Sequence, residues 1–361
     1  MQQEQQRPST AEIAAQARAA VDRALQRHIP GLSSLDELTG ELGATPKDVI
    51  YSQGTLKLYR YRPLCDEIYR VPIVLVMSLV SRSYILDLTK EQSLVEFLLQ
   101  QGFDVYLIDW GVPRAEHSTL RLEDYVLDFI PACVRVINED SGEPDVSMVG
   151  YCMGGQLASM YTALHADGPV KNLVCFTTPV NAEGMSLYRT WTDPAHFDLD
   201  RLITTLGNLP PELIEVSFDM LRPFQKTAGR LKLLDNIEDE AFVKAHLRFE
   251  RWAADQIPFA GETARQFITE FIRENKLVRN EFTLAGRKVD LGQIRVPFLH
   301  VAAEHDHIVP AEASRDLIGL IGSKDKSEIV LKGGHVSLVA GANAVRRLWP
   351  QLDRWLAERS V

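Results

Sequence analysis

The sequence predicts an α/β protein with a mostly parallel sheet, helices on both faces of the sheet, and an inserted helical segment. Continuous apolar runs, in which polar residues do not alternate with apolar ones, recur along the chain. Such runs are typical of strands buried on both faces. Stretches with helical spacing separate these runs, as in βαβ units with right-handed crossovers. Between residues 180 and 290 the rhythm changes to a helical, aromatic-rich pattern. The predicted parallel strands cover 71–80, 104–109, 146–149, 172–178, 296–303 and 327–332.

The same patterns divide the chain into segments. Residues 49–62 alternate in polarity around Gly54, which predicts an antiparallel hairpin. Residues 11–29 have an apolar face at helical spacing, so we expect an amphipathic helix that packs on the core or receives a partner. The insertion follows the fourth predicted parallel strand and would lie over the carboxyl ends of the strands, where open α/β sheets bind ligands. The predicted divisions are an N-terminal helical segment at 1–47, a core at 48–180 and 291–361, and a cap at 181–290.

Composition excludes several classes of protein. The 361 residues carry a formal net charge of −10, which argues against a nucleic-acid-binding protein. The polar first ten residues lack the layout of a signal peptide, and no apolar run approaches the length of a transmembrane segment. The four cysteines show neither C-x-x-C nor zinc spacing, so we expect reduced thiols in a cytoplasmic protein.

The most informative motif is Gly-Tyr-Cys-Met-Gly-Gly at 150–155, which places Cys152 where a hydrolase nucleophile elbow usually has serine. A predicted strand precedes it, and apolar side chains at helical spacing follow it. The turn is sharp, so its glycines allow close approach of the backbone and Cys152 is expected to be strained. The alternative is a buried structural cysteine in a glycine-rich turn.

Two further residues complete a candidate triad. Asp306 follows the predicted strand at 296–303, and His335 follows two glycines after the last predicted strand. The chain order of cysteine, acid and histidine matches the order in α/β-hydrolases. Taken singly, Asp306 could be a turn or helix-cap residue and His335 a solvated loop residue. His305 and His307 with Glu304 suggest a metal site, but no second histidine cluster completes it, so we expect no metal.

The oxyanion hole of this fold uses the amide after the nucleophile and one from the loop after the first parallel strand. We therefore expect the N–H groups of Met153 and Val80 as donors, with Ser81 as the alternative to Val80. A cysteine nucleophile forms an acyl-thioester that stays activated, which favours transfer of the acyl group to an alcohol over hydrolysis.

These residues carry a family resemblance. The chain resembles polyhydroxyalkanoate synthases from about residue 50 to its end, and its short length resembles the class III and class IV catalytic subunits. Met153 resembles class IV more than class III, where glutamine is usual, and serine stands at 81 where asparagine is expected. The matching motifs lie at 84–88, 104–113, 150–155, 251–258, 306–310, 321–326, 333–337 and 355–360.

The resemblance implies an acyltransferase that polymerises (3R)-hydroxyacyl-CoA, in particular 3-hydroxybutyryl-CoA, and releases CoA. Cys152 would carry the acyl chain and His335 would take its proton, while Asp306 either activates the substrate hydroxyl or orients His335. His307 would contact substrate. The resemblance also implies a small accessory subunit, a homodimer, a position at the surface of cytoplasmic polyester granules, and no cofactor beyond the CoA of the substrate.

Two other functions stay open at this stage. A cysteine-dependent thioesterase or intracellular polyester depolymerase of the same fold would pass the acyl group to water instead of a second hydroxyacyl unit. A catalytically silent granule-coating protein would have an unreactive Cys152 and exposed apolar surface.

Overall fold

The structure, a computed structural model, describes residues 42–361, apart from the side chains at positions 225 and 227. The helix predicted at 11–29 and nearly all of the N-terminal segment at 1–47 lie outside the described residues. Within 42–361, no helix is long and apolar enough to span a membrane.

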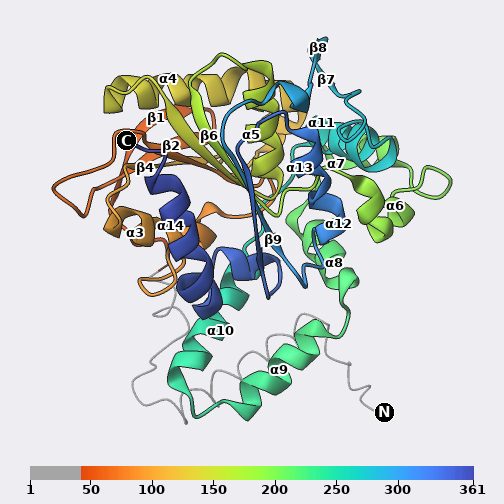
Figure 1. Ribbon diagram of the computed structural model, residues 1–361. Coiled ribbons are helices and arrows are strands. Elements are labelled where there is room, and N and C mark those ends of the chain that lie inside the picture. The colour runs from red at the N-terminus through yellow and green to blue at the C-terminus, as the bar shows by residue number, and fades with distance from the viewer. Residues whose placement is uncertain (1–41) are drawn as a thin grey trace, which may run out of the picture.

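An eight-stranded sheet forms the centre of the molecule (Figure 1). Its strand order is β1-β2-β4-β3-β5-β6-β9-β10. The hairpin of β1 and β2 pairs antiparallel with β4, and all the other neighbours are parallel. The strands are β1 (Lys47–Gln53), β2 (Leu56–Tyr61), β3 (Ile73–Val76), β4 (Val105–Asp109), β5 (Val146–Tyr151), β6 (Val170–Phe176), β9 (Phe298–Ala303) and β10 (Lys326–Leu331).

The sheet agrees with the strands expected from the apolar runs, with one instructive difference. The run at 71–80 predicts one long strand, whereas β3 ends at Val76. Residues 77–80 are just as buried as the strand, but they form a loop at its carboxyl end. A run of apolar residues reports burial on all sides, and it does not distinguish a strand from a buried loop that follows it.

Helices cover both faces of the sheet (Figure 1). On one face α3 (Leu94–Gln100) packs against α14 (Trp349–Ala357), where the rings of Phe97 and Trp349 lie 5.5 Å apart. α5 (Met153–Leu164) lies against β5, β6 and β3 on the other face, with α4 (Ile130–Ser141) beside β5 and β1. α12 (Ala311–Ser314) and α13 (Asp316–Leu320) connect β9 to β10.

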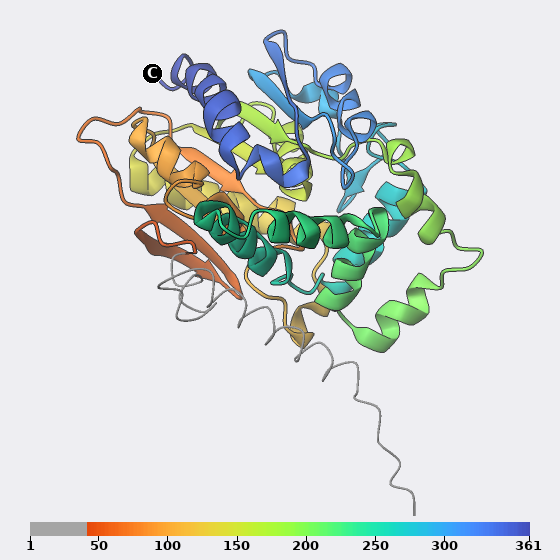
Figure 2. The same cartoon turned by 90° about the horizontal axis from the view of Figure 1, so that it is seen from below.

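A long insertion separates β6 from β9. Figure 1 shows α9 and α10 as the elements furthest from the sheet, and in the view from below the helices of the insertion lie across the front of the molecule (Figure 2). Its last helices are tied to the chain between β4 and α4, because Gln266 accepts a hydrogen bond from the Leu122 amide at 2.8 Å. Its elements are α6 (Ser186–Trp191), α7 (Leu199–Leu206), α8 (Pro211–Leu221), α9 (Gln225–Asp235), α10 (Glu240–Ala253), α11 (Gly261–Gln266), the π-helix η5 (Phe267–Arg273) and the short strands β7 (Thr283–Leu284) and β8 (Arg287–Lys288).

Candidate active site

Cys152 occupies the sharp turn between β5 and α5. Its backbone has φ 56° and ψ −123°, a left-handed conformation that is strained for a residue with a Cβ. A Cβ on Gly150 would lie 2.4 Å from the Cα of Gly155, and one on Gly154 would lie 2.0 Å from the carbonyl oxygen of Val76. The glycines therefore let the turn close on itself and let the start of α5 pack against the end of β3. The Cys152 side chain is half-buried.

The loops after β9 and β10 bring the other two triad residues together. The amide of Glu304 donates to the Leu331 carbonyl and the amide of His305 donates to the Gly333 carbonyl, both at 2.9 Å. These bonds continue the pairing of the two strands past their ends. As a result, Nδ1 of His335 lies 2.7 Å from Oδ2 of Asp306, with both side chains almost completely buried.

Four donors surround the carboxylate of Asp306. Oδ1 accepts the amides of Ile308 and Val309 at 2.9 and 2.8 Å. Oδ2 accepts the hydroxyl of Thr177 at 2.5 Å as well as Nδ1–H of His335. Burial by itself would raise the pKa of Asp306, but the positive charge of His335 and these hydrogen bonds hold the pKa below its ordinary value of 3.8. The carboxylate thus stays charged and fully hydrogen-bonded.

His335 links the carboxylate to the thiol. Its Nδ1 forms the hydrogen bond with Asp306, and the ring lies close enough to Cys152 for the charge of that side chain to act on it. Burial alone would lower the pKa of His335, but the negative charges of Asp306 and Cys152, together with the hydrogen bond to Asp306, raise it to about 10. Tyr151 holds the same loop, since its hydroxyl donates to the His335 carbonyl at 3.5 Å. The site therefore stabilises an imidazolium at His335 beside the elbow sulfur, which is the arrangement that activates a cysteine nucleophile.

The two expected oxyanion donors lie at neighbouring points of this edge of the sheet. Met153 begins α5, and Val80 lies in the loop after β3. Within the described residues, neither backbone N–H donates a hydrogen bond, so both are available to a ligand. The Val80 carbonyl is engaged, because it accepts the amide of Ile257 at 3.3 Å. Ser81, the alternative donor, pairs with Gln256 in an antiparallel bridge.

His307, the expected substrate contact, lies beside the triad without joining it. Its side chain is half-buried, and Nδ1 is a buried atom with no hydrogen-bond partner in the described chain. Burial lowers the pKa of His307, and the nearby positive charge of Arg222 lowers it further. A neutral ring with an unpaired nitrogen beside Asp306 could take a hydrogen bond from a ligand.

The insertion also contributes a side chain to the site. Tyr188 of α6 is mostly buried, and its ring meets that of Trp191 edge to face at 5.7 Å. Burial, followed by the negative charges of Cys152 and Asp306, raises the pKa of Tyr188 above its ordinary value of 10.0. Its phenol is therefore close enough to sense both charges, and it remains neutral near neutral pH.

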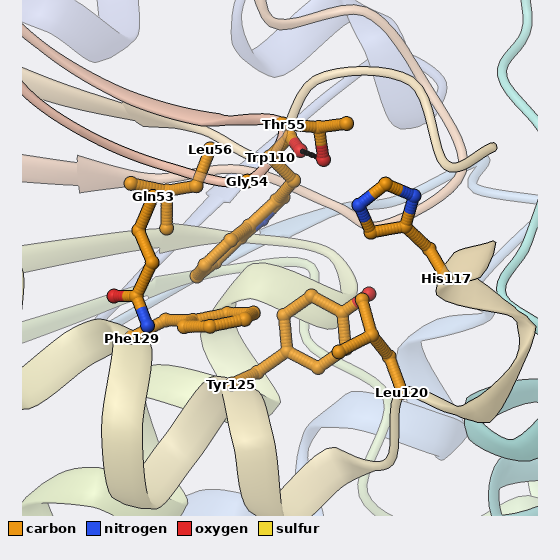
Figure 3. A pocket seen from close by; sticks show the side chains of 9 residues that line it. All are labelled: Gln53, Gly54, Thr55, Leu56, Trp110, His117, Leu120, Tyr125 and Phe129. Atoms are coloured by element: carbon orange, nitrogen blue, oxygen red, sulfur yellow. Dashed lines mark hydrogen bonds between the residues drawn. The ribbon is translucent and has the colours of Figure 1, made fainter.

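Beyond the triad, residues 42–361 hold a pocket but no cluster of metal ligands. No group of three or more histidine, cysteine, aspartate and glutamate side chains there could hold a metal ion. A pocket of about 190 Å³ lies between the β1–β2 turn and the chain after β4, with the rings of Trp110, Tyr125 and Phe129 on its wall (Figure 3). None of the triad residues lines that pocket, so it is separate from the candidate active site.

Sequence reasoning missed Thr177 and Tyr188 as site residues. The positive φ of Thr177 has no local signature, because threonine rarely adopts it. Tyr188 stands out only as one of many aromatic residues in the insertion. In both cases the partner is distant in sequence, so only the folded chain reveals the contact.

The sheet order and the elbow define the class of protein: the chain has the α/β-hydrolase fold, as the sequence predicts. The profile of the family described as alpha/beta hydrolase fold matches residues 73–342. A putative lipase from Sulfolobus solfataricus superposes with a TM-score of 0.57 at 18% identity, covering 86% of this chain and 93% of the lipase. A soluble variant of monoglyceride lipase from Saccharomyces cerevisiae gives a TM-score of 0.54 at 14% identity, covering 89% and 98%. At such identities these likenesses show the fold alone.

Curated relatives identify the family within that class. The chain is 39% identical over 323 residues to the poly(3-hydroxyalkanoate) polymerase subunit PhaC of Allochromatium vinosum, covering 88% of this chain and 90% of the relative. It is 36% identical over 360 residues to the subunit of the same name from Haloferax mediterranei, covering 99% and 71%. The profile described as Poly-beta-hydroxybutyrate polymerase (PhaC) N-terminus matches residues 33–98. The chain belongs to the poly(3-hydroxyalkanoate) polymerase family and is an acyltransferase enzyme.

Proposed function

We propose that this enzyme builds polyhydroxyalkanoate from (3R)-hydroxyacyl-CoA through an acyl-thioester on Cys152. The observation that carries the mechanism is the buried hydrogen bond between Asp306 and His335, with the elbow cysteine close enough for its charge to act on the same imidazole. Family membership supports the polymer product, and the cysteine supports a covalent intermediate that keeps the acyl group activated.

In the acylation step, His335 already holds the proton of Cys152 at Nε2 as an imidazolium, and the sulfur of Cys152 attacks the carbonyl carbon of the substrate thioester. The N–H groups of Met153 and Val80 stabilise the negative charge on the carbonyl oxygen. The tetrahedral intermediate then expels the CoA sulfur, which takes the proton from His335 and leaves as free CoA. The acyl-enzyme is left with a neutral His335, and the proton of Cys152 has departed with CoA, so the step is balanced.

In the elongation step, a second acyl-thioester gains an ester bond at its carbonyl carbon and loses its C–S bond, and the expelled sulfur takes a proton from the base. The ester oxygen comes from the 3-hydroxyl of an acyl unit. Its proton must go to a base with a free acceptor site. Asp306 offers none, because Thr177, His335 and two backbone amides already occupy both carboxylate oxygens and its side chain has no exposed surface. This supports His335 as the base in both steps and Asp306 as the residue that orients it.

The insertion between β6 and β9 acts in this proposal as the cap predicted at 181–290. Tyr188 lies within electrostatic range of Cys152 and Asp306, and the contacts of Val80 and Ser81 with residues 256–257 attach the insertion to the oxyanion loop. A covered site excludes water, which would otherwise hydrolyse the acyl-enzyme. The cap must open enough for the acyl-CoA to enter and for the polyester to leave.

The environment of the enzyme is part of the same proposal. We place it at the surface of cytoplasmic polyester granules, as a homodimer that works with a small accessory subunit of the class III or class IV type. Large apolar side chains are exposed on α8, α9 and α10, which supports contact with an apolar surface. They are Leu213, Val216, Met220, Leu231, Leu234 and Phe249, with Phe224 between α8 and α9.

Purified enzyme supplied with 3-hydroxybutyryl-CoA tests the proposal, with and without an accessory subunit. Free thiol and polymer mass are followed together, and Cys152→Ala is the control. We expect CoA release matched by polymer. Release of CoA with monomeric 3-hydroxybutyrate would identify a thioesterase instead. No release, with a Cys152 that resists alkylation, would favour the granule-coating alternative.

A further inference from the structure

Thr177 adopts a backbone conformation that threonine avoids. It directly follows β6, has φ 41°, and is completely buried. Positive φ is uncommon for any residue other than glycine, and for a β-branched residue it is a marked outlier that costs free energy. The fold maintains it in part through the Thr177 amide, which donates to the Val301 carbonyl at 2.7 Å. A residue that the surrounding structure holds in a strained conformation next to an active site indicates a functional role for that conformation.

The strained backbone directs the Thr177 hydroxyl at the triad. Oγ1 donates to Oδ2 of Asp306 at 2.5 Å, across 129 residues of sequence. This is the same carboxylate oxygen that accepts Nδ1–H of His335 at 2.7 Å. The next residue behaves differently, since the hydroxyl of Thr178 donates to the nearby Phe176 carbonyl at 3.4 Å and also acts on the Cys175 thiol, so its partners lie outside the triad.

A buried threonine does not need this arrangement to satisfy its hydroxyl. Thr162, also buried, donates to the Ala158 carbonyl one helical turn earlier at 2.7 Å, without any backbone strain. The need of a buried hydroxyl for a hydrogen-bond partner therefore does not explain the strained backbone of Thr177. The feature that distinguishes it is the acceptor, a charged triad oxygen, and hydrogen bonds to charged groups are the stronger kind.

We propose that Thr177 is a positioning residue for acyl transfer, acting through Asp306 on His335. This inference rests on the proposed function. The hydroxyl holds Oδ2 in place while two amides hold Oδ1, so the carboxylate keeps one orientation toward the imidazole. The Thr177 hydroxyl also draws on the negative charge of Oδ2. Asp306 then attracts the His335 imidazolium less strongly, so the proton is held on His335 less tightly. An imidazolium held less tightly returns its proton more readily to the departing CoA sulfur.

The test compares three variants for pH dependence. Thr177→Val keeps the shape and β-branching but removes the hydroxyl. Thr177→Ser keeps the hydroxyl, and Thr178→Val removes a neighbouring buried hydroxyl that does not touch the triad. Each is assayed between about pH 2 and about pH 11 for alkylation of Cys152 by iodoacetamide and for release of CoA from 3-hydroxybutyryl-CoA. The titratable or charged groups around the pair, which stay the same in all three variants, are Cys152, Tyr151, Tyr188, His307 and Arg222.

We expect kcat for CoA release to fall about tenfold in Thr177→Val, with KM nearly unchanged, because a hydrogen bond to a charged group is lost. Both limbs of the pH profile should move to higher pH. The acid limb moves because Asp306 loses a donor that favours its charged form, and the basic limb moves because Asp306 then holds the His335 proton more tightly. Thr177→Ser should restore the wild-type profile, and Thr178→Val should leave it in place.

A lower rate with unmoved pH limbs in Thr177→Val would overturn the proposal and leave Thr177 as a packing residue. If Thr177→Val fails to fold, Thr177→Gly replaces it, since glycine accepts the backbone conformation without strain. The alkylation profile separates this inference from the proposed function, because it needs no polymerisation. Absent CoA release in the wild type would reject the function, whereas unmoved alkylation limbs would reject the role of Thr177.

Discussion

The indole N–H of Trp252, near the end of α10, donates to the carbonyl oxygen of Arg82 at 3.0 Å. This bond joins the insertion to the loop that carries the expected oxyanion donor Val80. Asp255 strengthens the junction, because its carboxylate accepts Nε–H of Arg82 at 3.3 Å and the hydroxyl of Tyr84 at 3.1 Å. The shape of the oxyanion loop therefore depends on a segment about 170 residues further along the chain.

Trp252→Phe should lower kcat several-fold, because loss of one hydrogen bond worth about 1 kcal/mol loosens the oxyanion loop. Alkylation of Cys152 should keep its wild-type rate, since the thiol–imidazole pair is untouched. The matched control is Trp355→Phe, which removes a buried indole N–H that has no hydrogen-bond partner in the described chain. Equal effects on alkylation and on turnover in Trp252→Phe would mean that the bond supports the whole site, not the oxyanion loop.

Replacement of Cys152 tests the covalent step. Cys152→Ala should abolish CoA release, because no other group in the elbow can form the thioester. Cys152→Ser should fold normally but react far more slowly, since an alkoxide is harder to generate than a thiolate. Mass spectrometry after substrate addition should detect an acyl adduct on the wild type and none on Cys152→Ala. Full activity in Cys152→Ala would reject the mechanism.

The histidine should titrate far from its ordinary pKa of 6.5. Because Asp306 and Cys152 raise the pKa of His335 to about 10, its NMR signal should stay that of an imidazolium through neutral pH. A raised folded-state pKa stabilises the protein fully below about pH 6.5, and that stabilisation is lost as the pH rises toward 10. Cys152→Ala should lower the pKa of His335, since one of the two negative neighbours is gone. A His335 signal that titrates near pH 6.5 in the wild type would contradict this account.

Asp306→Asn separates the two roles left open for the carboxylate. If Asp306 only orients His335, single-turnover acylation and later elongation should slow by similar factors, because both steps use the same histidine. Rapid-quench measurement of CoA release and of polymer length in one experiment gives both rates. Near-normal acylation with poor elongation would instead favour direct activation of the substrate hydroxyl by Asp306.

Gly154→Ala should destabilise the fold by at least about 2 kcal/mol, because its Cβ would lie 2.0 Å from the backbone oxygen of Val76 and force α5 away from β3. Gly319→Ala is the matched control. It adds the same methyl group in α13 with no atom within 4 Å, and should be neutral or stabilise by up to about 1 kcal/mol. Urea unfolding of both variants gives the comparison. Equal stability of the two would remove the steric explanation for this glycine.

Local features of the sequence determined the fold class and the places where chemistry could occur. Buried strands can be recognised from neighbouring residues alone, because a strand buried on both faces needs an apolar side chain at nearly every position. The elbow at Cys152 is equally local, since its sharp turn requires glycines at fixed spacing. The chain order of Cys152, Asp306 and His335 then indicated an α/β-hydrolase topology, and the family motifs narrowed it further.

Only the tertiary structure decided how these residues meet. β3 ends at Val76 because the buried loop after it turns toward the insertion, which no apolar pattern records. The Thr177 hydroxyl reaches Asp306 through a positive φ that threonine would not adopt alone, and Trp252 reaches Arg82 across the insertion. Each contact depends on long-range packing that compensates for local strain or for the entropy of loop closure. Such contacts are properties of the whole fold and leave no pattern in the residues on either side of them.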